Sequence, residues 1–405
     1  MRPPRRQESG ATFISLFSGC GGFDIGFLEA GYKCLGACDI DENVVATHRL
    51  NLNSPAYCCD LSSGTLAVPH AQQPDVVLAG SPCQGFSTAG KRQIDDPRNH
   101  LLVAAAKIGV QLKPTVFIAE NVAGVTAGAH KRYWEEADSI LRNAGYQTVT
   151  VTIQATDLGM GQLRRRVVLI AWNVDRQPIL AFETRRAKTL QEVLSNLPVD
   201  AKEFAITLSE GSIPAVIAAR IGPGQKLSNV RGGPRAVPTW EIPTVYGRTS
   251  EQDKAVLRLV QRLRRQHRVR KTGDADPVSL STLSTYFGTD ITNRIRSLVD
   301  RGYLRDVDDR IDLTNTFNGK FRRLAWNAPS LTVDTRFGDP RYFLHPDENR
   351  GFSVREAARI QGFADHFQFL GTPRQRFRMI GNAVPPPISR ELAFMVSPIF
   401  TGQPR

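Results

Sequence analysis

The feature that most constrains the fold is an alternation of apolar, strand-length segments with segments of helical periodicity between residues 12 and 172. Strands are predicted at residues 12–17, 32–38, 75–79, 115–119, 146–153 and 166–172. Helices are predicted between them at residues 23–30, 41–50, 101–112 and 131–144. Such alternation is typical of a doubly wound, mostly parallel sheet with helices on its faces. The predicted fold class is therefore α/β.

The alternation stops near residue 175, and a chain of 405 residues is long enough to contain a second, smaller domain. Residues 181–325 are rich in Arg, Pro and Gly and lack the regular pattern. Residues 326–405 regain apolar helical character, with a helix predicted at 353–361. We therefore expect residues 1–180 and 326–405 to form one domain, into which residues 181–325 are inserted as another.

The chain carries 52 Lys and Arg residues against 39 Asp and Glu residues, which gives a net charge of +13. This excess favours a polyanionic partner such as nucleic acid, and the alternative is a basic protein without such a partner. No apolar run reaches membrane-spanning length, and no hydrophobic signal core follows the basic residues 1–6. We expect a cytoplasmic protein without a membrane partner.

The six cysteines lack the paired short spacings of a zinc site, so no metal is predicted. One of them stands in the heptapeptide Ser-Pro-Cys-Gln-Gly-Phe-Ser at residues 81–87, shortly after the apolar strand predicted at 75–79. The end of a strand in an open α/β sheet is where a nucleophile is presented to a ligand. Cys83 is therefore a candidate nucleophile, and the alternative is a turn with an unreactive thiol.

The first strand is followed by a glycine-rich turn, Phe-Ser-Gly-Cys-Gly-Gly-Phe at residues 17–23, that opens a helix. Glycines at such a position let a ligand approach the backbone at the helix start. Asp39 follows the second strand, where a carboxylate can bind ribose hydroxyls while Ile40 packs on adenine. Asp60, at a third strand end, could accept a hydrogen bond from the adenine amino group. The alternative for both aspartates is ordinary capping of strand ends.

Further motifs follow in order along the chain. They are Glu-Asn-Val at residues 120–122, Gln-Leu-Arg-Arg-Arg at 162–166 and Gly-Asn-Ala-Val-Pro at 381–385. Together with the heptapeptide and the glycine-rich turn, they resemble the motifs of the DNA (cytosine-5-)-methyltransferase family. The resemblance implies a Rossmann-like methyltransferase domain that uses S-adenosyl-L-methionine and releases S-adenosyl-L-homocysteine.

The resemblance also implies a mechanism, in which a methyl group is transferred to carbon 5 of a cytosine within a specific double-stranded DNA site. Cys83 would add to carbon 6 of the base, which must leave the duplex because a thiol cannot reach it inside the stack. Glu120 would hold or protonate ring nitrogen 3, and Arg166 would face the ring oxygen. Arg164 would order the cysteine loop or contact a phosphate.

The same resemblance implies the binding residues. The cofactor contacts would be Phe17, Ser18, Gly19, Gly22, Phe23, Asp39, Ile40, Asp60, Leu61, Asn382 and Val384. The family often has Glu where this chain has Asp39, a departure that affects cofactor affinity. Gln84 and Ser87 would contact DNA. We expect a monomeric enzyme of the bacterial cytoplasm, associated with the nucleoid, with a cognate restriction endonuclease as a candidate partner.

The inserted region, residues 181–325, corresponds to the family's target-recognition domain. Within residues 249–315 the predicted elements are helices at 249–266, 279–287 and 292–301 and a hairpin at 303–314. This order resembles a winged helix-turn-helix in which Arg294 and Arg296 would reach DNA. The alternative is a helical scaffold that touches no bases. Likewise, the basic cluster at residues 262–271 is either a phosphate-binding surface or a solvated helix face.

Two other functions remain open at this point. A tRNA cytosine methyltransferase has the same fold, but such relatives usually carry a short recognition region and a Cys-Phe-Thr sequence, and neither is present here. A DNA-binding regulator without catalysis would not need the thiol, the carboxylate and the arginines of the motifs above.

Overall fold

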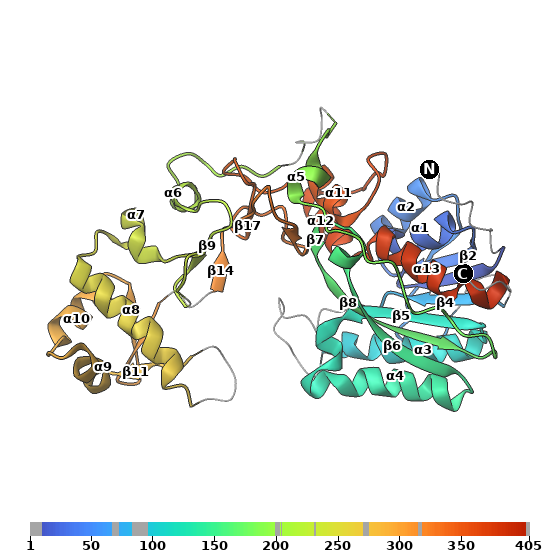
Figure 1. Ribbon diagram of the computed structural model, residues 1–405, viewed down its shortest axis with the longest axis horizontal. Coiled ribbons are helices and arrows are strands. Elements are labelled where there is room, and N and C mark those ends of the chain that lie inside the picture. The colour runs from blue at the N-terminus through green and yellow to red at the C-terminus, as the bar shows by residue number, and fades with distance from the viewer. Residues whose placement is uncertain are drawn as a thin grey trace. The chain divides into compact units, whose positions relative to one another are not determined.

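The structure is a computed structural model, and it describes residues 10–66, 73–82, 96–198, 203, 205–230, 232–269, 275–314 and 318–401 (Figure 1). The chain folds into two compact units. The first unit comprises Met1–Glu203, Asn327–Arg336 and Val354–Arg405. The second unit comprises Phe204–Trp326 and Phe337–Ser353. Within the described ranges, no helix is long and apolar enough to cross a membrane.

The first unit is built on a central sheet, which within the described residues has the strand order β3-β2-β1-β4-β5-β8-β6. Its strands are β1 (Thr12–Leu16), β2 (Lys33–Asp39), β3 (Ala56–Cys58), β4 (Val76–Ala79), β5 (Val116–Val122), β6 (Gln147–Gln154) and β8 (Arg165–Trp172). Strands β1 to β5 pair in parallel, whereas β8 runs antiparallel to both β5 and β6. The predicted α/β fold with a mostly parallel sheet is confirmed.

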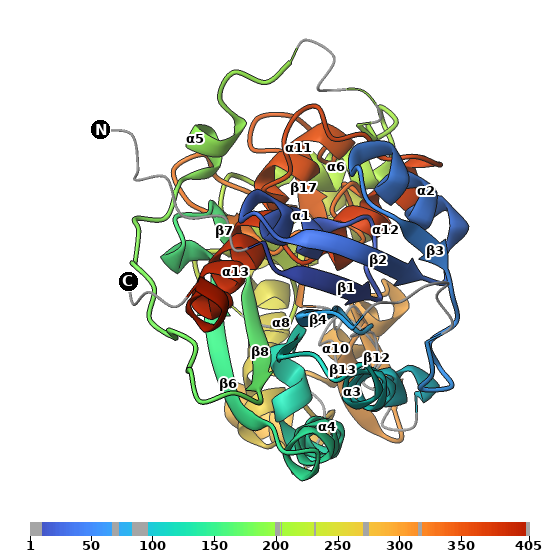
Figure 2. The same ribbon diagram turned by 90° about the vertical axis from the view of Figure 1, so that its right-hand side faces the viewer.

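Helices cover both faces of this sheet (Figure 2). One face packs against α1 (Gly22–Glu29) and α13 (Pro386–Thr401), and the other packs against α3 (Leu101–Leu112) and α4 (Lys131–Asn143). Because side chains alternate along a strand, Phe13 points to the first layer and its neighbour Ile14 to the second. Both are buried, and each contributes about 1.5–3 kcal/mol of hydrophobic free energy.

Two later segments, Asn327–Arg336 and Val354–Arg405, return to the first unit and complete it. Strand β16 (Ser330–Leu331) pairs in parallel with β7 (Gln162–Leu163). Helices α11 (Val354–Gln361) and α12 (Pro373–Asn382) follow. The start of α12 is fixed by a capping box of Thr372 and Gln375 and by a proline in the first turn. We call residues 381–384, which leave α12, the closing segment.

The second unit contains a compact module with the predicted order of three helices and a hairpin, together with a short strand, β11, that was not predicted. Its elements are α8 (Glu251–Gln266), β11 (Val278–Ser279), α9 (Leu280–Phe287), α10 (Thr292–Asp300), β12 (Leu304–Val307) and β13 (Arg310–Leu313). The strands form an antiparallel sheet in the order β11-β13-β12. Ser250 and Asp253 form a capping box at the start of α8, as a serine followed three residues later by an acidic residue predicts. The module has an apolar core, to which Trp240 and Tyr246 of the second unit also contribute.

The remaining elements belong to one or the other of the two units. In the second unit they are α6 (Ile213–Arg220), α7 (Pro243–Tyr246), β9 (Lys226–Ser228), β10 (Ala236–Val237), β14 (Asn318–Lys320), β15 (Arg322–Arg323), β17 (Phe343–Leu344) and the 3-10 turn η6 (Thr239–Glu241). In the first unit they are α2 (Glu42–Asn51), α5 (Leu190–Leu194) and the 3-10 turns η1 (Pro97–His100), η2 (Ala123–Thr126), η3 (Gly128–His130) and η4 (Ala155–Asp157).

Candidate active site

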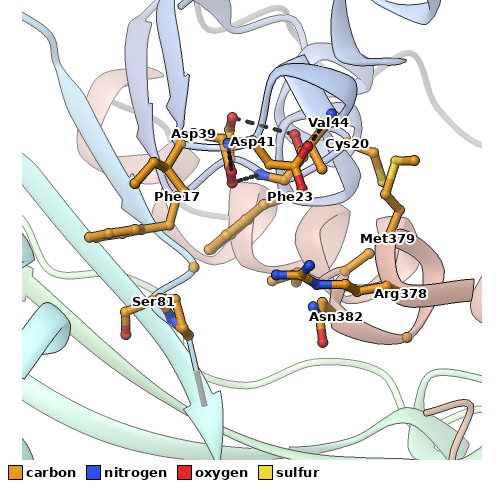
Figure 3. Close-up of a pocket in the computed structure, with 18 of the residues that line it drawn as sticks. Phe17, Cys20, Phe23, Asp39, Asp41, Val44, Ser81, Arg378, Met379 and Asn382 are labelled. Carbon is orange, nitrogen blue, oxygen red and sulfur yellow. Dashed lines mark hydrogen bonds between the residues drawn. The ribbon is translucent and has the colours of Figure 1, made fainter. Parts of the chain in front are cut away.

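A cavity of about 220 Å³ lies in the first unit, at the carboxyl ends of the parallel strands (Figure 3). Most of the predicted cofactor contacts line it. These are Phe17, Ser18, Gly19, Phe23, Asp39, Ile40, Asp60, Leu61, Asn382 and Val384. Open α/β sheets bind ligands at this edge, so the sequence motifs meet where the fold predicts a site.

Gly22 was also predicted to contact the cofactor, but it does not line this cavity. A Cβ at Gly22 would overlap the carbonyl oxygen of Val384 and would lie 3.1 Å from the Cβ of Ala383. The residue is glycine because α1 approaches the closing segment too closely for a side chain. Gly22 therefore brings one wall of the cavity into place, and its contact with the cofactor stays a prediction.

Asp39 joins the end of β2 to the glycine-rich turn. Its carboxylate accepts hydrogen bonds from the backbone N–H groups of Gly19, at 3.0 Å, and Asp41, at 3.1 Å. Burial raises the pKa of Asp39 above its usual range, although these hydrogen bonds partly oppose the shift. Asp41 in turn caps α2 by accepting from the N–H groups of Asn43 and Val44.

A buried polar network links the elements that flank the glycine-rich turn. The hydroxyl of Ser15 in β1 donates to Asp24 in α1 at 2.6 Å, and the other carboxylate oxygen of Asp24 lies 2.8 Å from Nε2 of His48 in α2. Asp24 and His48 are fully buried. The network ties together the elements on either side of the turn. Sequence reasoning missed it because its members look like ordinary helix and strand residues.

Glu120 and Arg166 form an ion pair at the cavity wall. The register of β5 with β8 places Arg166 opposite Val122, so Glu120, two residues back on the same face, is its diagonal neighbour. Nε of Arg166 lies 2.8 Å from Oε1 of Glu120, and their side chains are only 10% and 9% exposed. Both residues line the cavity, which brings together the two predicted groups for the cytosine ring.

Asn121, between these motif residues, holds the end of β4. Its side-chain amide donates to the carbonyl and hydroxyl oxygens of Ser81, at 3.4 and 3.2 Å. Ser81 and Pro82 line the cavity and are the last described residues before the cysteine loop. The predicted Cys83, Gln84 and Ser87 lie outside the described residues. Asn121 belongs to the Glu-Asn-Val motif recognised in the sequence, but its hydrogen bonds to Ser81 were not predicted.

Arg164 requires a correction. Its guanidinium donates to the carbonyl oxygens of Val333, Gly381 and Ala383, at 2.9–3.4 Å, and the residue is only 2% exposed. A side chain this deeply buried does not reach a DNA phosphate, so that part of the prediction is wrong. Arg164 instead holds the closing segment in place. The other predicted role, ordering of the cysteine loop, concerns residues outside the described ranges.

Two buried glutamines hold the same segment. The amide of Gln361 donates to the carbonyl oxygens of Ile380, at 3.0 Å, and Ala383, at 2.9 Å. Gln162 donates to the side-chain oxygen of Gln361 at 2.9 Å and accepts from the N–H of Val333. Gln162 belongs to a recognised motif, whereas nothing in the sequence singled out Gln361.

Cys20 also lines the cavity, but it is a poor nucleophile. Burial raises the pKa of Cys20 to about 12, so its thiol stays protonated at neutral pH. In the described part of the chain, no group of side chains is arranged to hold a metal ion.

Of the predicted DNA contacts in the second unit, Arg294 has partners within the protein. Its guanidinium donates to Asp253 at 2.7 Å and also to Gln252, at the start of α8. Arg294 therefore fastens α10 to α8, and its contact with DNA stays a prediction. Arg296 is exposed, and its contact with DNA stays a prediction. In the basic cluster, Arg264 is buried in an ion pair with Asp312, so it is not a phosphate ligand.

Comparison with known proteins identifies the family. The chain matches the model of the C-5 cytosine-specific DNA methylases over residues 11–396. The chain belongs to this family. It is therefore a DNA cytosine-5 methyltransferase, an enzyme that methylates cytosine in DNA. Family membership also implies S-adenosylmethionine as methyl donor, and it favours a DNA-directed enzyme over a tRNA-directed enzyme or a regulator.

Individual proteins agree with this assignment. The Type II methyltransferase M.XorII of Xanthomonas oryzae pv. oryzae is 29% identical, over 96% of this chain and 85% of its own. M.DdeI of Desulfomicrobium norvegicum is 30% identical, over 95% of this chain and 88% of its own. The solved structure of S. pombe Dnmt2 has a TM-score of 0.52 and 14% identity, and covers 96% of this chain and 99% of its own. At that identity the structural likeness supports the fold alone.

Proposed function

We propose that this enzyme methylates carbon 5 of a cytosine flipped out of a specific double-stranded DNA site, through a transient bond between Cys83 and carbon 6. The observation that carries the proposal is the pair of Glu120 and Arg166. This pair lines the same cavity as the ligand-binding carboxylates and the strand end that leads to Cys83. One cavity thus gathers groups for the base and groups for the methyl donor.

The lining residues fit S-adenosylmethionine. The carboxylates of Asp39 and Asp60 are acceptors for ribose hydroxyls and for the adenine amino group, respectively. A hydrogen bond from the N–H of Ser62 lowers the pKa of Asp60, which keeps it an ionised acceptor. Ile40 is 66% exposed on the cavity wall, an unusual exposure that suits the flat face of adenine. When bound, S-adenosylmethionine supplies an electrophilic methyl group.

The residues of the chain activate the base. Carbon 5 of cytosine is a poor nucleophile, and addition of the Cys83 thiolate to carbon 6 turns the ring into an enamine. As the thiolate adds, negative charge develops on the ring, and a proton held by Glu120 at nitrogen 3 stabilises it. Arg166, fixed beside Glu120, faces the ring oxygen and stabilises the same charge. After methyl transfer, loss of the proton from carbon 5 to water releases Cys83.

Covalent trapping tests this proposal. Duplex DNA with 5-fluorocytosine at the target, incubated with S-adenosylmethionine, is expected to form a stable adduct, because fluorine cannot leave as a proton does. The variant Cys83→Ser should form no adduct and should still bind S-adenosylhomocysteine. The matched control Cys58→Ser, at an exposed cysteine, should form the adduct normally. An adduct with Cys83→Ser would refute the assignment of the nucleophile.

The wider setting is also proposed. Relatives named Type II methyltransferases lead us to propose that the enzyme, as a monomer, protects a recognition site from a cognate restriction endonuclease in the bacterial cytoplasm, near the nucleoid. We assign the recognition of that site to residues 181–325, including the winged-helix module at 249–315. Bisulfite sequencing of DNA from cells that express the chain tests this, since methylation without a common sequence context would contradict it.

A further inference from the structure

Arg378 is a charged residue of the cavity wall that the proposed mechanism does not use. It lies on α12, is exposed, and lines the cavity. Figure 3 shows its side chain reaching from α12 toward the interior of the cavity, near Phe23 and Asn382. Within the described part of the chain, Arg378 has no hydrogen-bond or ion-pair partner.

The other cations of the wall are already engaged. Arg166 is paired with Glu120, and Arg164 donates to backbone carbonyls. The carboxylates of Asp39 and Asp41 accept backbone N–H groups. Among the described residues that line the cavity, Arg378 therefore offers a positive charge that no protein group neutralises. An unpaired guanidinium that faces a ligand cavity is suited to a carboxylate or phosphate of the ligand.

The geometry of the cavity indicates which part of the donor would meet this charge. The sulfur of S-adenosylmethionine carries the adenosyl group, the methyl group and an amino-acid chain. The adenosyl group belongs with Asp39, Ile40 and Asp60, and the methyl group must point toward Glu120 and Arg166. Among the described residues that remain, those of α12 and the start of α1 form one part of the wall, and Figure 3 shows Arg378 there beside Phe23.

We propose that Arg378 binds the carboxylate at the amino-acid end of S-adenosylmethionine. The inference rests on the proposed function of this cavity and adds a binding residue to it. The guanidinium would form charge-assisted hydrogen bonds to that carboxylate and so orient the chain attached to sulfur. An alternative is that backbone N–H groups at the start of α1 hold the carboxylate alone. The two binding modes differ in the effect of removing Arg378. If Arg378 binds the carboxylate, its loss weakens only ligands that carry this group, whereas binding by the backbone alone predicts no such selective loss.

The test compares two ligands on the full-length protein by isothermal titration calorimetry. One is S-adenosylhomocysteine, and the other is its analogue that lacks the carboxylate. The variants are Arg378→Met, which removes the charge, and Arg378→Lys, which keeps it without the fork geometry. The matched control is Arg374→Met, an exposed arginine of the same helix that does not line the cavity. Circular dichroism of each variant checks that it is folded.

The wild type is expected to prefer S-adenosylhomocysteine over the analogue by roughly 10- to 100-fold. Arg378→Met should lose most of this preference by weakening only the carboxylate ligand, Arg378→Lys should restore part of it, and Arg374→Met should keep it. A full preference in Arg378→Met, or an equal loss for both ligands, would overturn the inference. Failure of the wild type to bind S-adenosylhomocysteine would instead overturn the proposed cofactor site, and the inference with it.

Discussion

Replacing Gly22 by Ala is expected to weaken both the packing of α1 and the binding of cofactor. The added Cβ would overlap the carbonyl oxygen of Val384, far inside a usual contact distance of about 3.5 Å. The new Cβ and the carbonyl oxygen of Val384 are both fixed to the backbone and cannot rotate away from each other. Helix α1 and the closing segment must therefore separate by about 1 Å. Such overpacking costs about 1–3 kcal/mol, and the better helix propensity of Ala offsets about 0.5–1 kcal/mol of it.

The expected net effect of Gly22→Ala is a loss of about 1 kcal/mol in the free energy of unfolding, within a range of about 0–2.5 kcal/mol. Because Val384 lines the cavity, a shift of this size should also weaken S-adenosylhomocysteine binding by about 10-fold or more. Urea denaturation followed by circular dichroism measures the first effect, and isothermal titration calorimetry measures the second. A variant that matches the wild type in both measurements would refute the reasoning.

Gly26→Ala is the matched control, one turn further along α1. A Cβ there would overlap the backbone of Ser389 and Arg390 in α13, neither of which lines the cavity. The stability loss should be similar, whereas the affinity for S-adenosylhomocysteine should stay within about twofold of the wild type. Equal losses of affinity in both variants would show that Gly22 acts through overall stability and not through the cavity wall.

The remaining predictions concern charged groups. Burial raises the pKa of Asp39, so its carboxylate, the proposed acceptor for the ribose hydroxyls, should become protonated at a higher pH than an ordinary Asp. Affinity for S-adenosylhomocysteine should therefore decline as the pH falls through this range. Calorimetry should find this decline absent in Asp39→Asn. Glu120→Gln should slow the single-turnover methylation rate by about 100-fold or more, and a wild-type rate would reject its role. Asp312→Asn should destabilise the winged-helix module by about 3–5 kcal/mol because it leaves Arg264 buried without a counter-charge; an unchanged urea midpoint would contradict this.

The sequence was sufficient for features that depend on near neighbours. Helix α3 begins and ends where its apolar run predicts, and the helix predicted from residue 41 begins directly after Asp41, which caps it. Local periodicity and capping determine both helices. The mostly parallel sheet followed from the same local patterns. The cavity motifs were also recognisable, since each is a short run of residues at a strand end.

The contacts of Arg164 and Arg294 depend on partners that are distant in the sequence. The carbonyls that Arg164 bonds lie 169–219 residues further along the chain, so its burial could not be read from the arginine run around it. Arg294 finds Asp253 41 residues earlier, after an intervening helix and strand. The capping box predicted at Ser250 and Asp253 gave no sign that the carboxylate of Asp253 would also pair with Arg294. In both cases an exposed cation was expected where the fold supplied an acceptor.

The cavity takes one wall from the turn after β1 and another from the closing segment, more than 350 residues apart in the chain. During synthesis, the turn leaves the ribosome long before residues 381–384 exist. A nascent chain that ends before residue 381 therefore lacks one wall of the cavity, whatever part of the sheet has already formed. We expect such a chain to bind the methyl donor poorly, so prematurely terminated products should not methylate DNA.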